Sequence, residues 1–155
     1  MMKMAENLLK AADSLLADAA TKTMGRRAIS TAYYAVFHTL TQMCTEELLG
    51  DEADTNSPEY ARVYRALDHG SMKAAFRAVP LKGLPQIQTI GNRAVELQSE
   101  RIRADYLPHK SKMYTRRQCS DLLQSARLTI EAVEKLAPAE RRVLAVHLIF
   151  KNRPQ

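Results

Sequence analysis

The chain has 155 residues, 46% of them hydrophobic, and a formal net charge of +6 at pH 7. This length fits one domain, and such a chain can bury roughly 70% of its unfolded surface around a single core. No apolar run approaches the ~18–20 residues of a membrane span. The N-terminal segment contains Glu6, Asp13 and Asp18, where a signal peptide would be apolar. We therefore expect a cytoplasmic protein with no membrane partner.

The charge is unevenly distributed along the chain. Residues 1–60 carry five Lys and Arg against nine Asp and Glu, a net −4, so the remainder carries +10. A basic region of this kind is typical of proteins that bind nucleic acid or nucleotides, and also of solvated helical faces that have no partner. Charge alone leaves both interpretations open.

The two cysteines, Cys44 and Cys119, each lie inside a helical pattern without a CxxC motif or a His-rich neighbourhood. Isolated cysteines of this kind are typical of small core residues in a reduced protein. No two histidines have the spacing that would place both on one helix face as metal ligands. We expect no metal site and no cofactor.

The first two predicted helices are long. Apolar residues at helical spacing indicate an amphipathic helix over about 3–21, and we expect Gly25 to end it. From 26 to about 49 the apolar positions run almost completely around the helix. That pattern predicts a central, mostly buried helix.

Shorter elements are expected in the middle of the chain. Residues 51–56 are acidic and polar and predict a loop. Ser57, which is followed by proline, can cap a helix that runs toward Gly70. Ser71 can then cap a shorter helix through Phe76.

The next segment is a predicted loop punctuated by Pro80, Gly83 and Pro85. A strong apolar stripe over about 87–106 predicts the third long helix. Pro108 is expected to stop that helix, because the residue before a proline is disfavoured in the helical conformation.

The last long helix is predicted to end near Leu136. Thr115 and Gln118 have the spacing of a capping box at its start. Pro138 ends this helix and can begin a short one over 139–150. No strand alternation is present in the sequence.

Four long helices, with short helices between the second and third, predict an all-α fold, an antiparallel bundle. We assign residues 1–137 to the bundle. Residues 138–155 are expected to form an appended C-terminal helical tail that packs on the bundle or on a partner.

The segment 101–109 is unusually polar for the end of an apolar-periodic helix. Its sequence, Arg-Ile-Arg-Ala-Asp-Tyr-Leu-Pro-His, places two guanidiniums, a carboxylate, a phenol and an imidazole within nine residues. Residues 101–117 contain six cationic side chains against Asp105 alone. We expect anionic ligands, above all phosphates, to be attracted to this segment.

Three segments, at residues 27–38, 68–70 and 101–106, together resemble signatures of the small prokaryotic HEPN domain proteins. Residues 27–38, Arg-Ala-Ile-Ser-Thr-Ala-Tyr-Tyr-Ala-Val-Phe-His, resemble the signature of their second helix. The Arg-x-x-Ala-Asp-Tyr pattern at 101–106 resembles the signature near the end of their third long helix. Asp-His-Gly at 68–70 falls where these proteins often have a His-Gly pair that opens a short helix. The resemblance covers roughly residues 5–136.

The resemblance implies an HEPN-type four-helix bundle that is usually homodimeric and, in many members, a metal-independent ribonuclease. The mark of the active members is an arginine followed, after four to six intervening residues, by a histidine. Arg103 and His109 match this spacing with five residues between them. Other Arg–His pairs match as well, but only this pair flanks the Ala-Asp-Tyr signature. Arg101 matches the signature more directly and lies outside the spacing, so either arginine can be the functional one.

Metal-free RNA cleavage needs a base for the 2′-hydroxyl proton, an acid for the leaving oxygen, and positive charge on the phosphorane. His109 titrates near neutrality and is the candidate base or acid. Arg103, and Arg101 as the alternative, would stabilise phosphate charge. Asp105 could orient one of these groups, and Tyr106 could bind phosphate or stack on a base. A two-fold dimer would bring a second His109 to the same cleft.

Four further residues complete the candidate RNA- or nucleotide-binding set: Lys110, Lys112, His69 and Tyr34. Each singled-out residue also has a structural interpretation. Tyr34 fits core packing, His69 fits a helix cap or loop, and His109 fits an exposed loop. Arg101 and Asp105, four residues apart, fit a helix-surface ion pair worth about 0.3–0.5 kcal/mol.

The sequence thus predicts an HEPN-type, RNA-directed module, with a toxin-like metal-independent endoribonuclease as the catalytic interpretation. The alternative is a noncatalytic nucleotide- or protein-binding helical module. The expected partners are RNA or a nucleotide, a second copy of the chain in a homodimer and, by analogy with the family, a nucleotidyltransferase antitoxin.

Overall fold

The computed structural model describes residues 3–17, 22–108 and 113–151. Within these residues the chain forms seven α-helices and one short 3₁₀ turn, with no strand, so the predicted all-α class is confirmed. None of the helices in this part of the chain is both long and apolar enough to cross a membrane.

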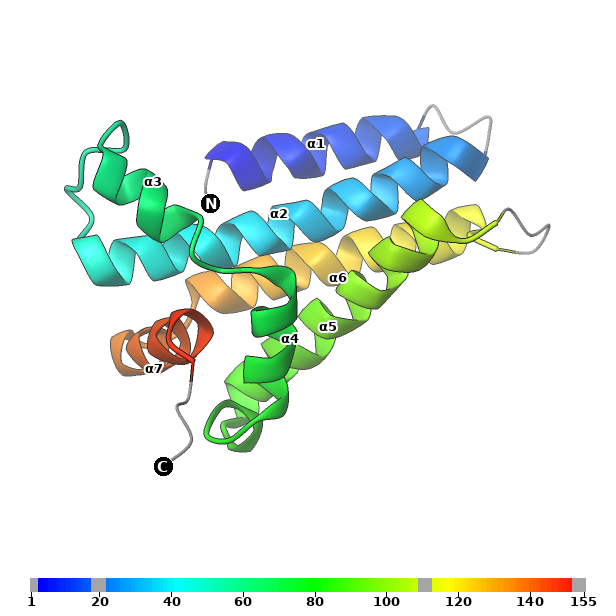
Figure 1. Ribbon diagram of the computed structural model, residues 1–155. Helices are drawn as coiled ribbons and strands as arrows, with labels where there is room; N and C mark the ends of the chain where they lie inside the picture. Colours follow the sequence, from blue (N-terminus) through cyan, green and yellow to red (C-terminus); the bar gives the residue numbers. More distant parts are fainter. Residues whose placement is uncertain (1–2, 18–21, 109–112, 152–155) are drawn as a thin grey trace.

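Four long helices form the body of the molecule (Figure 1): α1 (Lys3–Ala17), α2 (Lys22–Leu49), α5 (Pro85–Tyr106) and α6 (Arg116–Glu134). α2 contacts the other three, as expected for a central helix, and is buried over much of its surface. α1 runs opposite to α2, and α5 runs opposite to α6. The end of α1, the start of α2, the end of α5 and the start of α6 therefore meet at one end of the body, on the right in Figure 1.

Gly25 does not end a helix, so that prediction was wrong. It lies in the first turn of α2 and is buried. A Cβ atom at this position would lie 3.0 Å from Sγ of Cys119 in α6, so the missing side chain allows α2 and α6 to approach closely. Cys119 and Cys44 are both buried and free, as predicted. α1 is described as far as Ala17, and its predicted extension to residue 21 lies outside the described residues.

A short helix, α3 (Pro58–Tyr64), follows α2. Ser57 is its N-cap as predicted, because Oγ of Ser57 accepts a hydrogen bond of 3.1 Å from the backbone N–H of Tyr60. The prediction that this helix continues toward Gly70 was wrong, since α3 ends at Tyr64.

The next helix, α4 (His69–Arg77), is capped by Asp68 and not by Ser71 as predicted. The carboxylate of Asp68 accepts hydrogen bonds from the backbone N–H of Ser71 at 2.7 Å and from its Oγ at 2.6 Å. These contacts hold the pKa of Asp68 below its ordinary value. A charged carboxylate makes the stronger hydrogen bond at a helix N-terminus, so α4 begins two residues before Ser71.

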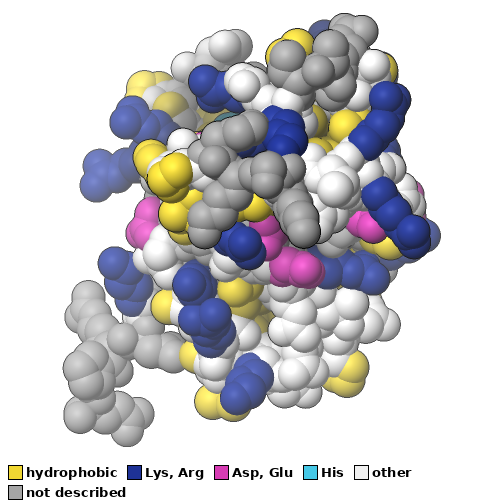
Figure 2. All heavy atoms as spheres, turned by 90° about the vertical axis from the view of Figure 1, so that its right-hand side faces the viewer, with side chains coloured by type: hydrophobic (Ala, Val, Ile, Leu, Met, Phe, Trp, Pro, Cys, Tyr) yellow, Lys and Arg dark blue, Asp and Glu magenta, His cyan; other side chains and the backbone are white. Residues whose placement is uncertain are grey.

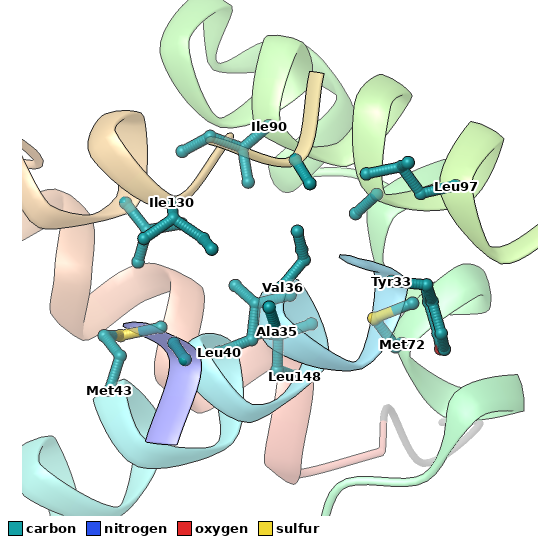
Figure 3. Close-up of a cluster of buried hydrophobic side chains, with 14 of the residues drawn as sticks. Tyr33, Ala35, Val36, Leu40, Met43, Met72, Ile90, Leu97, Ile130 and Leu148 are labelled. Carbon is teal, nitrogen blue, oxygen red and sulfur yellow. The ribbon is translucent and has the colours of Figure 1, made fainter. Parts of the chain in front are cut away.

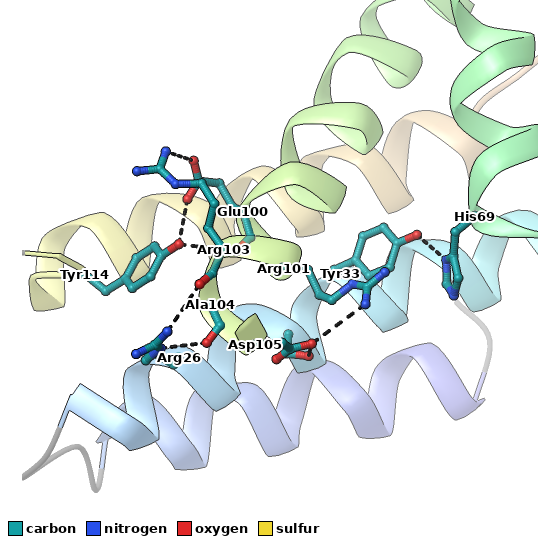
Figure 4. A network of polar contacts seen from close by, with 10 residues as sticks. Arg26, Tyr33, His69, Glu100, Arg101, Arg103, Ala104, Asp105 and Tyr114 are labelled. Atoms are coloured by element: carbon teal, nitrogen blue, oxygen red, sulfur yellow. Dashed lines mark hydrogen bonds and ion pairs between the residues drawn. The ribbon is translucent and has the colours of Figure 1, made fainter. Parts of the chain in front are cut away.

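α4 packs very closely on α5, which follows after the 3₁₀ turn Leu81–Gly83. A Cβ atom at Gly91 of α5 would lie only 2.5 Å from Cδ1 of Phe76 in α4. This glycine therefore fixes how closely the two helices approach. Their packing places His69, the first residue of α4, beside the C-terminal half of α5 (Figure 4).

α6 begins with the predicted capping box. The backbone N–H of Gln118 donates to Oγ1 of Thr115, and the backbone N–H of Thr115 donates to Oε1 of Gln118. After α6, the last helix α7 (Pro138–Ile149) buries Leu144 and Leu148 in the same core as the long helices. In the described residues the C-terminal helix therefore packs on the bundle, against α2 and α4.

The main hydrophobic core joins the described helices other than α3 (Figure 3), and a second, smaller cluster consists of Ile29, Ala104, Tyr114 and Cys119. The fully buried side chains of the main core come from α2, α4, α5, α6 and α7, and include Tyr33, Leu40, Met72, Ile90, Leu97, Ile130 and Leu144. Truncating one such side chain to alanine typically costs about 2–5 kcal/mol. This packing holds α2, α4 and α5 in fixed positions, and the candidate site lies at their junction.

Candidate functional site

Arg101 and Arg103, the two candidate phosphate-binding arginines, point to different sides of α5 (Figure 4). Residues two apart are separated by about 200° around a helix, so their side chains diverge. Arg101 is only 8% exposed, whereas the side chain of Arg103 is 53% exposed. The structure does not bring the two guanidiniums together.

Arg101 is held between one carboxylate and two aromatic rings. Its Nη1 lies 3.8 Å from Oδ2 of Asp105, which also accepts a hydrogen bond from Oγ of Ser30. Its guanidinium carbon lies 5.3 Å from the ring centroid of Tyr33 and 5.8 Å from that of Tyr34, within cation–π range. The ion pair with Asp105 therefore exists, but the arginine in it is buried rather than on the helix surface.

His69 meets this cluster from α4. Its Nδ1 lies 2.5 Å from the hydroxyl of Tyr33. Burial raises the pKa of Tyr33, and burial together with the nearby Arg101 charge lowers the pKa of His69. Both groups are therefore neutral at pH 7. The phenol can donate to Nδ1, which leaves the proton of His69 on Nε2.

Tyr34 and His38 are half-buried, unlike the fully buried Tyr33 beside them. Nδ1 of His38 lies 2.7 Å from the hydroxyl of Tyr64 in α3. Burial lowers the pKa of His38, so this ring is also neutral at pH 7. Packing accounts for Tyr33, while Tyr34 and His38 each keep part of the ring accessible.

Arg103 lies on the opposite side of α5, near the start of α6. Its Nη1 is 3.2 Å from Oε1 of Glu100, and Oε2 of Glu100 accepts a 2.9 Å hydrogen bond from the hydroxyl of Tyr114. Burial and the Glu100 hydrogen bond raise the pKa of Tyr114 to about 12. The adjoining cavity of about 430 Å³ also has Glu96 and Asp121 in its lining. The surroundings of Arg103 are therefore rich in carboxylates.

Arg26 of α2 holds the C-terminal end of α5. Its Nε donates to the backbone oxygen of Ala104 at 2.6 Å, and its Nη2 donates to the carbonyls of Arg103 and Leu107. A cation at this position binds carbonyls at the C-terminal end of α5 and complements the negative end of its dipole. Beside this contact lies an open groove of about 450 Å³, which the 74% exposed Tyr106 helps to line.

The end of the body where α2, α5 and α6 meet is rich in cations (Figure 2). We call it the basic end and define it by Lys22, Arg26, Arg27, Arg103, Arg116 and Arg117. Lysine and arginine side chains are spread around this face, and a few carboxylates lie between them. Two helices begin and two end here, so their dipoles offset one another, and the positive potential comes from the side chains.

Three of the predicted site residues, His109, Lys110 and Lys112, lie outside the described residues. Among the others, the structure gathers four at the junction of α2, α4 and α5, namely Tyr34, His69, Arg101 and Asp105. Arg103 and Tyr106 are not part of that group. Arg103 faces α6, and Tyr106 faces the groove beside Arg26.

The sequence reasoning missed Arg26, Tyr33 and Gln98 as partners of these residues. Gln98 is 5% exposed and donates from Nε2 to the backbone oxygen of His69 at 3.0 Å. The spacing of Gln98, Arg101 and Asp105 along α5 places them on one helix face, and this signal could have been used. Nothing in the sequence pairs Arg26 with the end of α5, because that contact spans about 80 residues.

In the described part of the chain no group of three or more His, Cys, Asp or Glu residues is arranged to hold a metal ion. The fold and the site define a helical bundle with a basic end and a buried arginine beneath an aromatic surface. No family model, curated protein or solved structure matches the chain.

Proposed function

We propose that this protein is an RNA-directed module of the HEPN type, and that its basic end binds the phosphates of RNA. The observation that carries this proposal is the convergence of cationic side chains from α2, α5 and α6 at one end of the body (Figure 2). Phosphate contacts by Lys and Arg supply most of the sequence-independent affinity for nucleic acid.

The catalytic form of the proposal is a metal-independent endoribonuclease in which Arg103 binds phosphate and His109 transfers a proton. The exposure of Arg103 supports this assignment over Arg101, because a phosphate can reach Arg103 while Arg101 is enclosed. In a homodimer a second His109 would supply the second proton-transfer group. A nucleotidyltransferase antitoxin would be the neutralising partner.

A second candidate function is RNA or nucleotide binding without cleavage. The ion pair of Arg103 with Glu100, and the carboxylates of Glu96 and Asp121 in the adjoining cavity, favour this candidate. These negative charges oppose the approach of a phosphate to Arg103. The groove beside Arg27 has a single carboxylate among its lining residues, that of Asp105.

Binding is tested by the salt dependence of RNA affinity. We expect the slope of log K against log salt concentration to fall by about 0.7 for each lost phosphate contact with single-stranded RNA, so Arg27→Ala and Arg116→Ala should each flatten it. Arg62→Ala is the matched control, because Arg62 is an exposed arginine on α3 at the other end of the body. An unchanged slope in both basic-end variants would refute the proposed surface.

Cleavage is tested on a mixed RNA pool in EDTA with the wild type, Arg103→Ala and His109→Ala, each checked for unchanged helical content. Products that are lost in both variants but retained in Arg62→Ala establish the ribonuclease. The control is well matched because Arg62 and His69 also have the Arg–His spacing of the family. Binding without products selects the noncatalytic function. Sedimentation at micromolar concentration tests the dimer.

A further inference from the structure

Four half-buried rings form a row across α2 and α3. We call this the aromatic row and define it by Tyr34, His38, Tyr64 and Tyr60. Neighbouring ring centroids are 6.5 Å apart for Tyr34 and His38, 5.8 Å for His38 and Tyr64, and 6.0 Å for Tyr64 and Tyr60. The last two pairs are nearly parallel, with interplanar angles of 26° and 21°. The row is therefore a continuous aromatic surface in which none of the four residues is buried.

Contacts beneath and within the row hold its rings in place. The 2.7 Å hydrogen bond between His38 and Tyr64 ties α2 to α3. Tyr34 packs edge-on against His69, with centroids 6.0 Å apart, and the guanidinium of Arg101 lies 5.8 Å from the Tyr34 ring. Arg101 is more than nine-tenths buried, and its Nε has no partner among the described residues. The charge of Arg101 is paired with Asp105, and its guanidinium supports the Tyr34 ring from beneath through a cation–π contact.

The aromatic row continues from the basic end along one face of α2. Arg27, Thr31, Tyr34 and His38 are spaced i, i+4, i+7 and i+11, which places them in one stripe on the helix. None of the four is buried, whereas Ala28 and Ala35, which point to other faces of α2, are fully buried. The stripe therefore connects the exposed Arg27 of the basic end with the accessible rings of Tyr34 and His38.

We propose that the aromatic row is a stacking platform for the bases of single-stranded RNA whose phosphates are bound at the basic end. This inference rests on the proposed function and names the form of RNA that the surface takes. A cationic groove joined to aromatic rings is the arrangement by which proteins bind single strands, because phosphates meet the cations and unpaired bases stack on the rings. Bases in a duplex are already stacked and paired and cannot reach the rings.

The charges and polar groups of the surface favour this ligand. Asp105, the carboxylate beside Arg101, is already engaged by that guanidinium and by Ser30. Glu46, the carboxylate near Tyr60, is engaged by Arg141. The row therefore presents accessible rings next to the basic end, and the cations of the basic end supply the positive potential that complements a polyanion.

The test compares binding of a fluorescein-labelled single-stranded RNA with binding of a duplex RNA of the same length. Tyr34→Ala should weaken single-strand binding by roughly 5- to 150-fold, the range expected when one base–aromatic stack is removed, and should leave duplex binding unchanged. Tyr34→Phe should bind like the wild type, because it keeps the ring and no hydrogen bond links the Tyr34 hydroxyl to another described residue. Phe150→Ala is the control for an exposed ring elsewhere, at the end of α7.

The outcomes separate this inference from the proposed function. Wild-type binding that survives both Tyr34→Ala and Tyr60→Ala overturns the platform and leaves the basic end intact. A wild type that binds neither RNA overturns both proposals. If Tyr34→Ala weakens the binding of single-stranded and duplex RNA equally, Tyr34 has a general role and the platform is overturned. If the Tyr34→Ala variant sediments as a smaller species than the wild type, Tyr34 is a dimer contact and the platform is also overturned. Tyr60→Ala, on the short helix α3, repeats the test should Tyr34→Ala lose helical content.

Discussion

The close contact between α4 and α5 makes Gly91→Ala an informative perturbation. The new Cβ would lie 2.5 Å from Cδ1, 2.8 Å from Cγ and 3.0 Å from Cβ of Phe76. All three distances are too short for carbon atoms that are not bonded to each other, and one of the contacted atoms is attached directly to the backbone of α4. Phe76 is buried, so its ring cannot simply swing into solvent. The two helices must separate slightly to admit the methyl group.

Two opposing effects set the size of the change. Overpacking in a tight core typically costs about 1–3 kcal/mol. Replacing glycine by alanine inside a helix returns up to about 1 kcal/mol through helix propensity. We therefore expect Gly91→Ala to lower the free energy of unfolding by about 1 kcal/mol, within a range of roughly 0–2. A Phe76→Ala background removes the two shortest contacts, to Cδ1 and Cγ, and leaves only the 3.0 Å contact to Cβ. The same substitution should therefore cost less there than in the wild type, or stabilise the protein.

Chemical denaturation followed by far-UV circular dichroism measures this double-mutant cycle. Gly70→Ala is the matched control, because Gly70 is also helical but its nearest contact for a new Cβ is an ordinary 3.4 Å from Oδ1 of Asp68. It should be neutral or stabilising by up to about 1 kcal/mol. If Gly91→Ala stabilises the protein as much as Gly70→Ala does, or if the cycle shows no coupling, α4 does not approach α5 as described.

Three further predictions concern stability. Burial lowers the pKa of His38 and of His69 below 6.5 in the folded protein, so the unfolded chain binds more protons when the pH falls below 6.5. The free energy of unfolding should therefore fall as the pH drops through this window. A variant with both His38→Gln and His69→Gln should show a weaker dependence of the free energy of unfolding on pH. Arg26→Ala should cost about 1–3 kcal/mol in denaturant unfolding because it removes the hydrogen bonds that hold the end of α5, while Arg27→Ala, an exposed position, should change stability by less than about 0.5 kcal/mol. Asp68→Ala should cost about 0.5–2 kcal/mol through the loss of the α4 cap, measured in the same way.

The long helices could be predicted because their signals are local. Hydrophobic periodicity located α1, α2, α5 and α6, and the capping box at Thr115 and Gln118 is a pattern of two residues three apart. The short elements between α2 and α5 were harder to predict. Asp68 and Ser71 are both good N-cap residues. Asp68 is the N-cap in the structure because its carboxylate accepts two hydrogen bonds from Ser71.

Gly25 shows a different limit of sequence reasoning. A glycine near a helix boundary usually predicts a break, and the pattern alone gives no other reason for it. In the structure its role depends on Cys119, which is 94 positions away and lies 3.0 Å from the place of the missing Cβ. Only the packing of α6 on α2 reveals that contact, so tertiary structure overrides the local rule.

The sequence places the candidate residues in one segment, whereas the structure separates the two arginines of that segment. Arg101 and Arg103 are neighbours in sequence, and the phase of the helix sends one beneath Tyr34 and the other toward α6. Under the two proposals these arginines act on different parts of one ligand. Arg103 belongs to the surface that binds phosphates, while Arg101 stays enclosed and supports the ring on which a base would stack. An Arg101→Lys substitution should then weaken single-strand binding through Tyr34 with little change in the salt slope, because a lysine keeps the charge but not the planar group that packs against the ring.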